Sequence, residues 1–196
     1  MNTSTIQALD PSRRFFVLQA ASTVLSAAAI GLMSGCESIA QSSDKSASQD
    51  VNILNVALGL EHEGIAAYQL GAESGLLEKF VLPTAVLFQE HHKAHRDALI
   101  ATIRKLGGTP VEEKRLVDYA KSLKADTLKN QTDVLSLAAK LELGATNAYL
   151  GVIPSFRDSN LAKVAARLAA DETMHWTVLT SALGRPLPQA ALTFGA

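Results

Sequence analysis

The sequence predicts an all-α protein built as a bundle of four long helices. Ala and Leu are abundant, Gly and Pro are sparse at 12 and 6 of 196 residues, and only 5% of the residues are aromatic. This composition favours packed helices over β-sheet. Apolar residues also recur every three or four positions over four segments, as expected when each helix buries one face.

The first 35 residues are typical of an export signal. Arg13 and Arg14 directly precede an apolar run from Phe15 to Gly35, and this arrangement resembles a twin-arginine translocation signal peptide. Polar residues such as Gln19 interrupt the run, so it is a poor permanent membrane span, and a retained anchor is the alternative. A twin-arginine signal implies that the domain folds, and can load a cofactor, before export.

The segment after the apolar run predicts a lipid-anchored tether. Cys36 follows Leu32-Met33-Ser34-Gly35, which resembles a bacterial lipobox with Cys36 as the lipidated first residue of the mature protein. Cleavage by the signal peptidase of soluble proteins is the alternative. Residues 36–50 are rich in Ser and poor in large apolar groups, so we expect a flexible tether. The bundle is expected over residues 51–185, with a tail over residues 186–196, in a periplasmic or membrane-anchored lipoprotein.

The four helices can be placed from the apolar spacing and from the residues that start and stop helices. They are predicted over residues 51–77, 83–106, 132–153 and 160–183. Pro83 and the Asp158-Ser159-Asn160 cluster mark starts, and the Gly and Pro residues that follow the second and fourth helices mark ends. Residues 111–131 are charged and weakly helical, so we expect a long crossover between helices two and three on the outside of the bundle.

An internal repeat relates the two halves of the predicted bundle. Glu61 is followed seven residues later by Tyr68, and the pattern returns 81 residues further on as Glu142 and Tyr149. A second match, at an offset of 80 residues, places His95 opposite a histidine of the fourth helix. The repeat therefore pairs helix one with helix three, and helix two with helix four.

Carboxylates and imidazoles interrupt the apolar stripe of every predicted helix about midway. Seven-residue spacing keeps a side chain on nearly the same helix face, so these groups are expected to point into the bundle. They are Glu61, His92, His95, Glu142, Glu172 and His175. Because unpaired buried carboxylates are costly and no Lys or Arg lies on these stripes, we expect a divalent metal pair as the counter-charge.

This pattern resembles the ferritin-like carboxylate-bridged dimetal proteins, in which two helices give one Glu each and two give a Glu-x-x-His pair. The matching residues are Glu61 and Glu142 for the single-Glu helices, Glu172 with His175 for one pair, and His95 for the other histidine. The resemblance covers residues 51–183 and implies a ferritin-like four-helix bundle that binds one or two Fe or Mn ions. It is closest to bacterial ferritin-like domain proteins that carry export signals.

The departure from the family pattern is His92, which stands where the family has its fourth Glu. A single-metal or asymmetric site is therefore an alternative to a full metal pair.

The resemblance implies reaction with peroxide or oxygen, or metal storage. The other hypothesis is a metal-free envelope module for stress protection or protein interaction.

Tyr68 and Tyr149 are expected to hydrogen-bond the ligands, with simple packing as the alternative. His91 is expected at the surface or beside the ligands.

Charge and cysteine content exclude several other classes. The formal net charge is −1, so the chain has no basic surface with which to bind nucleic acid. A single cysteine excludes an intramolecular disulfide framework and a zinc site built on paired thiolates. The sequence leaves the oligomeric state open, a homo-oligomer included.

Overall fold

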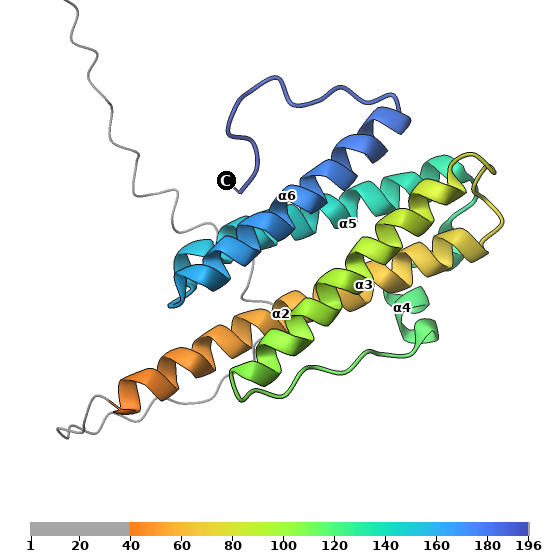
Figure 1. The fold of residues 1–196 in the computed structure, drawn as a ribbon. Helices are drawn as coiled ribbons and strands as arrows, with labels where there is room; N and C mark the ends of the chain where they lie inside the picture. The colour runs from red at the N-terminus through yellow and green to blue at the C-terminus, as the bar shows by residue number, and fades with distance from the viewer. Residues whose placement is uncertain (1–39, 196) are drawn as a thin grey trace, which may run out of the picture. The chain divides into compact units, whose positions relative to one another are not determined.

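The structure, a computed structural model, describes residues 40–195 (Figure 1). Within that range it contains five α-helices, two single-turn 3-10 helices and no β-strand, so the predicted all-α class is confirmed. The elements are α2 (Ala40–Glu73), α3 (Leu82–Lys105), α4 (Leu116–Ser122), η3 (Ala125–Thr127), α5 (Gln131–Val152), η4 (Ile153–Ser155) and α6 (Ser159–Ala182). None of these helices is long and apolar enough to span a membrane. The predicted signal peptide and Cys36 lie outside the described residues.

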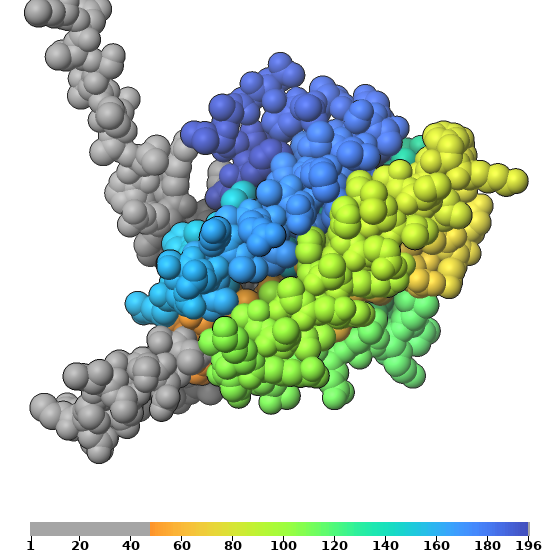
Figure 2. Space-filling model, in the orientation of Figure 1, coloured from red at the N-terminus to blue at the C-terminus, as the bar shows by residue number. Residues whose placement is uncertain are grey.

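Four of the helices form a bundle of two hairpins. Helix α2 packs against α3, α5 packs against α6, and α2 also contacts α5. Figure 2 shows α3 and α6 side by side along one face. Short connections join the helices of each hairpin, whereas α4 and η3 lie in a long crossover between α3 and α5, and α4 rests on α2. The predicted four-helix bundle with a crossover between its second and third helices is confirmed.

Local capping explains why three helices lie within one residue of their predicted bounds. The side chain of Asn130 accepts a hydrogen bond from the backbone N–H of Asp133 and caps α5, and Asp158 caps α6 by accepting from the N–H of Asn160. Helix α3 has a proline in its first turn. It ends at Lys105, two residues before Gly107, whose φ of +77° is in the left-handed region that favours glycine.

Helix α2 differs from its prediction at both ends. It stops at Glu73 instead of residue 77, because Gly75 adopts a φ of +69°. It starts at Ala40, so residues 40–50 are helical and not part of a flexible tether. The side chain of Asp50 is buried, and its carboxylate accepts hydrogen bonds from the backbone N–H groups of Arg157 and Asp158 at the start of α6.

The core consists of two apolar layers that are separated along the bundle axis. One layer contains Leu54, Ala57, Leu58, Leu99, Ile103, Tyr149, Leu161, Leu168 and Ala169. The other contains Tyr68, Ala85, Phe88, Leu135, Ala139 and Leu179. On every helix the predicted polar residues fall between the two layers. The apolar layers therefore close the bundle on both sides of a buried polar level.

Candidate metal centre

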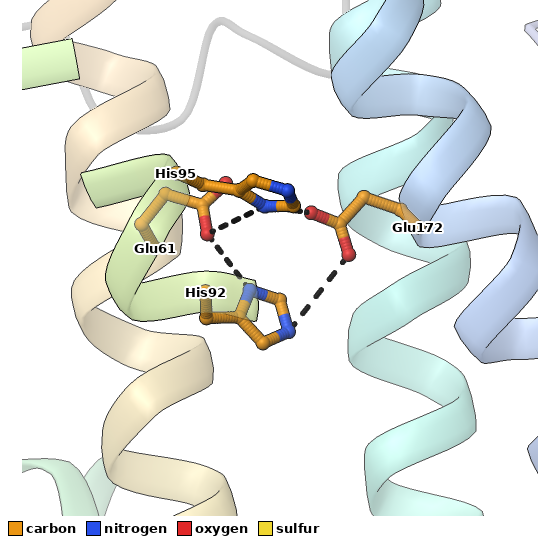
Figure 3. Close-up of side chains that lie close together, drawn as sticks. All are labelled: Glu61, His92, His95 and Glu172. Atoms are coloured by element: carbon orange, nitrogen blue, oxygen red, sulfur yellow. Dashed lines mark hydrogen bonds and ion pairs between the residues drawn. The ribbon is translucent and has the colours of Figure 1, made fainter. Parts of the chain in front are cut away.

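All six predicted ligands meet in one buried cluster at this polar level. Glu61 comes from α2, Glu142 from α5, and α3 and α6 each contribute a pair. None of the six is more than 9% exposed, and Glu172 and His175 are fully buried. Figure 3 shows four of the side chains converging from three helices. The regular spacing of these residues along their helices is what brings them to the same level.

The cluster contains two overlapping sets of donor groups. The first set is Glu61, His92, His95 and Glu172, and the second is His92, Glu142, Glu172 and His175. Within each set, one donor atom from every residue lies within 4.8 Å of the others. Two ligands of one ion are separated by at most about 4.6 Å, twice a typical metal–ligand distance. Each set is thus close to the spacing that one ion requires, and two residues, His92 and Glu172, belong to both.

His92 lies at the centre of the cluster. Its Nδ1 is 2.7 Å from Oε2 of Glu61, and its Nε2 is 3.2 Å from Oε1 of Glu142. The same Nε2 lies 3.8 Å from Oε2 of Glu172. The imidazole that replaces the expected fourth carboxylate therefore connects the single glutamates of α2 and α5.

Gly64 makes room for the His92 ring, a role that was not predicted from the sequence. A Cβ atom added to Gly64 would lie 3.1 Å from both Nδ1 and Cε1 of His92. The ring thus packs directly against the backbone of α2, in space that a larger side chain at residue 64 would occupy. The signal was not visible in the sequence, because the role of Gly64 depends on a residue of another helix.

His95 and His175 turn the same ring atom toward the carboxylates. Nδ1 of His95 lies 3.2 Å from Oε1 of Glu172, and Nδ1 of His175 lies 3.2 Å from Oε2 of Glu172. Nδ1 of His95 is also 3.6 Å from Oε2 of Glu61, and Nδ1 of His175 is 3.5 Å from Oε2 of Glu142. Both histidines therefore place a nitrogen between a carboxylate of α6 and one of a neighbouring helix.

The outward nitrogens of both histidines contact side chains at the edge of the bundle. Nε2 of His95 is 3.2 Å from Oδ2 of the exposed Asp171, and Nε2 of His175 is 2.9 Å from Nδ1 of the half-buried His91. Such outer contacts fix the orientation of a histidine ligand. His91 was expected near the ligands or at the surface, whereas Asp171 was missed because it lies on the outer side of the helix that carries Glu172.

Tyr68 and Tyr149, both buried, make the expected hydrogen bonds to the carboxylates. The hydroxyl of Tyr68 donates to Oε1 of Glu142, and that of Tyr149 donates to Oε1 of Glu61. Burial and the neighbouring carboxylates raise the pKa of both tyrosines well above the ordinary value of 10.0. Both hydroxyls therefore remain protonated donors that hold one oxygen of each glutamate in place.

Burial and the contacts between acidic and basic groups shift the pKa values in the cluster, and burial raises the pKa of Glu172 above its ordinary value. Burial alone lowers the pKa of His95, but the contacts with Glu172 and Glu61 outweigh it and raise the pKa to about 10. Carboxylates in the same way raise the pKa of His92 and His175. Burial raises the pKa of Glu61, but His92 and His95 lower it below its ordinary value. In the absence of a metal ion, imidazolium groups therefore neutralise the carboxylates.

The donor atoms also fit a divalent cation. Oε2 of Glu142 is buried and has no hydrogen-bond partner, and Nδ1 of His95 and Oε1 of Glu172 face each other at 3.2 Å as an ion pair without hydrogen-bond geometry. Buried polar atoms without a partner are uncommon in folded proteins. Each donor set combines two imidazoles with two carboxylates, which suits Fe, Mn and other divalent transition metals.

Comparisons with known proteins agree with this architecture. A family model described as a ferritin-like domain matches residues 49–185. Among solved structures, the chain is similar to a conserved hypothetical protein, rv2844, from Mycobacterium tuberculosis. The two share 21% sequence identity with a TM-score of 0.59 over 74% of this chain and 97% of that chain, a similarity that shows the fold alone. No curated protein matches the sequence.

Proposed function

Because the chain belongs to the ferritin-like domain family, we propose that its buried cluster binds one or two divalent ions, Fe or Mn. We further propose that the loaded protein acts as an oxidoreductase on peroxide or oxygen, or holds the metal in store. The observation that carries this proposal is the presence of two complete donor sets that share His92 and Glu172. A single set would suit one structural ion, whereas two overlapping sets suit a paired centre.

The charge balance supports stepwise loading. Three carboxylates, Glu61, Glu142 and Glu172, carry three negative charges, so one divalent ion leaves the cluster at −1 and two ions bring it to +1 when the histidines are neutral. Binding of each ion displaces protons from the imidazoles. The first ion should therefore bind more tightly than the second.

The residues of the chain hold and shield the centre, while Fe or Mn, when bound, supplies the electrons that reduce an O–O bond. Tyr68 and Tyr149 orient the carboxylates, and Asp171 and His91 orient the outer histidines. The apolar layers exclude bulk water along the bundle axis. Half-exposed His91 also offers a route for protons between the surface and His175.

Metal content per chain tests the binding proposal. The full chain is loaded anaerobically with Fe²⁺ or Mn²⁺, desalted, and analysed by inductively coupled plasma mass spectrometry beside a Glu142→Gln, Glu172→Gln double variant. Glu90→Gln is the matched control, because Glu90 is an exposed residue of α3 that pairs with Lys93. We expect about one to two equivalents in the wild type and control, and clearly less in the double variant. Less than about 0.1 equivalent in the wild type would contradict the proposal.

The second candidate is a metal-free envelope module for stress protection or protein interaction. The observation that favours it is the match of three histidines with three carboxylates, since this arrangement balances charge without an ion. Thermal unfolding before and after treatment with a strong chelator separates the two candidates. A metal protein loses stability on chelation, whereas a metal-free module keeps the same unfolding midpoint.

We also propose that the protein is exported after folding, through the twin-arginine pathway, and is anchored by Cys36. The support is the arginine pair, the apolar run and the residues before the cysteine. Cell fractionation tests this. Replacing Arg13 and Arg14 by Lys should retain the protein in the cytoplasm, and Cys36→Ser should release it from the membrane fraction without blocking export.

A further inference from the structure

A cavity of about 270 Å³ lies between α2 and α5, directly beside the candidate metal centre. Two residues of the cluster, His92 and Glu142, line it together with Tyr68, and all three are buried. Lys140 and Gly144 also line it and are exposed. The cavity therefore runs from the surface of the bundle to the ligands of the metal centre.

The crossover closes the neighbouring part of the same groove but leaves this part open. Further along α2 and α5, Leu123 and Leu128 of the crossover reach the helices, and only about 20 Å³ remain unfilled. Beside His92 no crossover residue lines the cavity. The opening is thus confined to the stretch of the groove that leads to the cluster.

The walls of the cavity are mainly apolar. Leu60 of α2 and Leu141, Ala138 and Ala145 of α5 form them. Of the charged groups outside the cluster, Glu63 and Lys140 also line the cavity and have opposite signs, so together they favour neither an anion nor a cation. Placing an unpaired charge against these walls would be unfavourable. The lining therefore selects for an uncharged ligand.

The volume is much larger than oxygen or peroxide requires. An apolar cavity of about 150 Å³ in a protein core is enough to hold benzene. A cavity of about 270 Å³ can therefore hold a substituted ring or a short branched chain. Pockets for small organic ligands combine apolar walls with a few polar groups at one end, as this one does.

We propose that this cavity binds a small, uncharged, mainly apolar organic molecule next to His92, at the metal centre. The inference rests on the proposed function, because only a bound metal ion would make this position a place where the ligand could react. The bound molecule would contact Leu60 and Leu141 along its length and approach Tyr68 and Glu142 at its inner end.

Titration with benzyl alcohol tests this inference. The full chain, with and without Co²⁺ as a spectroscopic substitute for Fe²⁺ or Mn²⁺, is titrated and followed by two-dimensional amide NMR and by visible absorption. Gly144→Phe is designed to fill the cavity, because Gly144 lines it and a Cβ there has no heavy atom within 4 Å. Gly59→Phe is the matched control, because Gly59 is equally open but lies outside the lining. Benzoate and benzylammonium serve as charged analogues.

We expect saturable binding of benzyl alcohol in the millimolar range, with amide shifts centred on Gly64 and Leu141. Gly144→Phe should weaken binding about tenfold or more, because the ring occupies the volume that the probe needs. Gly59→Phe should leave binding unchanged, and the charged analogues should bind more weakly. Saturation should also alter the Co²⁺ absorption bands.

Three outcomes would overturn the inference: no saturable binding, equal affinity in the two phenylalanine variants, or preference for a charged analogue. If Co²⁺ binds and benzyl alcohol does not, the cavity proposal fails and the proposed metal function stands. If benzyl alcohol binds but neither Co²⁺, Fe²⁺ nor Mn²⁺ does, the proposed metal function fails instead, and with it the placement of the ligand at a metal centre.

Discussion

The hydroxyl of Tyr149 donates a hydrogen bond to Glu61, a residue 88 positions away on the first helix of the bundle. In the other direction between the two helices, the hydroxyl of Tyr68 donates a hydrogen bond to Glu142, 74 positions away. Although each tyrosine stands seven residues after a glutamate of its own helix, it holds the glutamate of the other hairpin. Helices α2 and α5 are thus linked twice, through the carboxylates that belong to the candidate centre.

Removing one of these hydroxyls should weaken metal binding more than it weakens the fold. Tyr149→Phe leaves Oε1 of Glu61 without its donor, and loss of such outer contacts lowers metal affinity about tenfold or more. Competition with a chromophoric chelator measures this. Tyr119→Phe is the control, because Tyr119 is also buried but its hydroxyl contacts the backbone of Lys114 in the crossover. Equal affinities in the two variants would show that the tyrosine does not position a ligand.

Gly64→Ala should destabilise the protein, although alanine is the better helix former. The new methyl group meets the His92 ring at 3.1 Å, and overpacking of this kind costs about 1–3 kcal/mol. Gly59→Ala, where a Cβ meets nothing within 4 Å, should instead stabilise by up to about 1 kcal/mol. Urea unfolding of both variants gives the comparison. A stabilised Gly64→Ala protein would mean that the His92 ring is free to move away.

Restoring the expected carboxylate should favour a full metal pair. His92→Glu adds a negative charge to both donor sets at once, so metal content should rise to about two equivalents per chain. His92→Gln removes the imidazole without adding charge and is the matched control. Metal analysis after loading and desalting measures both variants. An unchanged content in His92→Glu would argue that geometry, not charge, limits the second ion.

Stability of the metal-free protein should fall as the pH rises from neutral to alkaline. The pKa of His95 is 6.5 in the unfolded chain and about 10 in the folded one, so its protonated form stabilises the fold fully below pH 6.5. That contribution is lost as the pH rises toward about 10. Urea unfolding across this range measures it.

His95→Gln provides the control for this pH dependence, because it removes one titrating group and should reduce the slope, while His92 and His175, whose pKa values are also raised, keep the remainder. Metal binding should show the opposite trend, since ions compete with the protons on His92, His95 and His175 and bind more tightly at higher pH. A metal-free protein whose stability is constant from neutral to alkaline pH would contradict the close pairing of His95 with Glu172 and Glu61.

Much of the fold could be predicted because its signals are local. Caps such as Asn130 and Asp158, and the glycine that ends α3, lie within a few residues of the boundaries they set. The membership of the cluster could also be predicted from local signals, because regular spacing on each helix puts Glu61 and Glu142 at one level. The start of α2 could not be predicted, because Asp50 is held by backbone groups more than 100 residues away.

The orientation of side chains within the site depends on pairs of helices and was accordingly harder to predict. Spacing indicated that His92 faces the core, but not that its ring packs on Gly64 and joins two glutamates. Spacing also gave no indication that His95 turns its outer nitrogen toward Asp171, since that contact is set by the packing of α3 against α6.

The shared position of His92 has a consequence for metal selectivity. The internal sequence repeat pairs His92 of one hairpin with Glu172 of the other, and this is the pair of ligands in which the two hairpins differ chemically. Both of them contribute to both donor sets, so each set still presents two nitrogens and two oxygens. An ion therefore meets the same kinds of ligand at either position, and ligand type alone gives no preference for a mixed-metal pair over two identical ions.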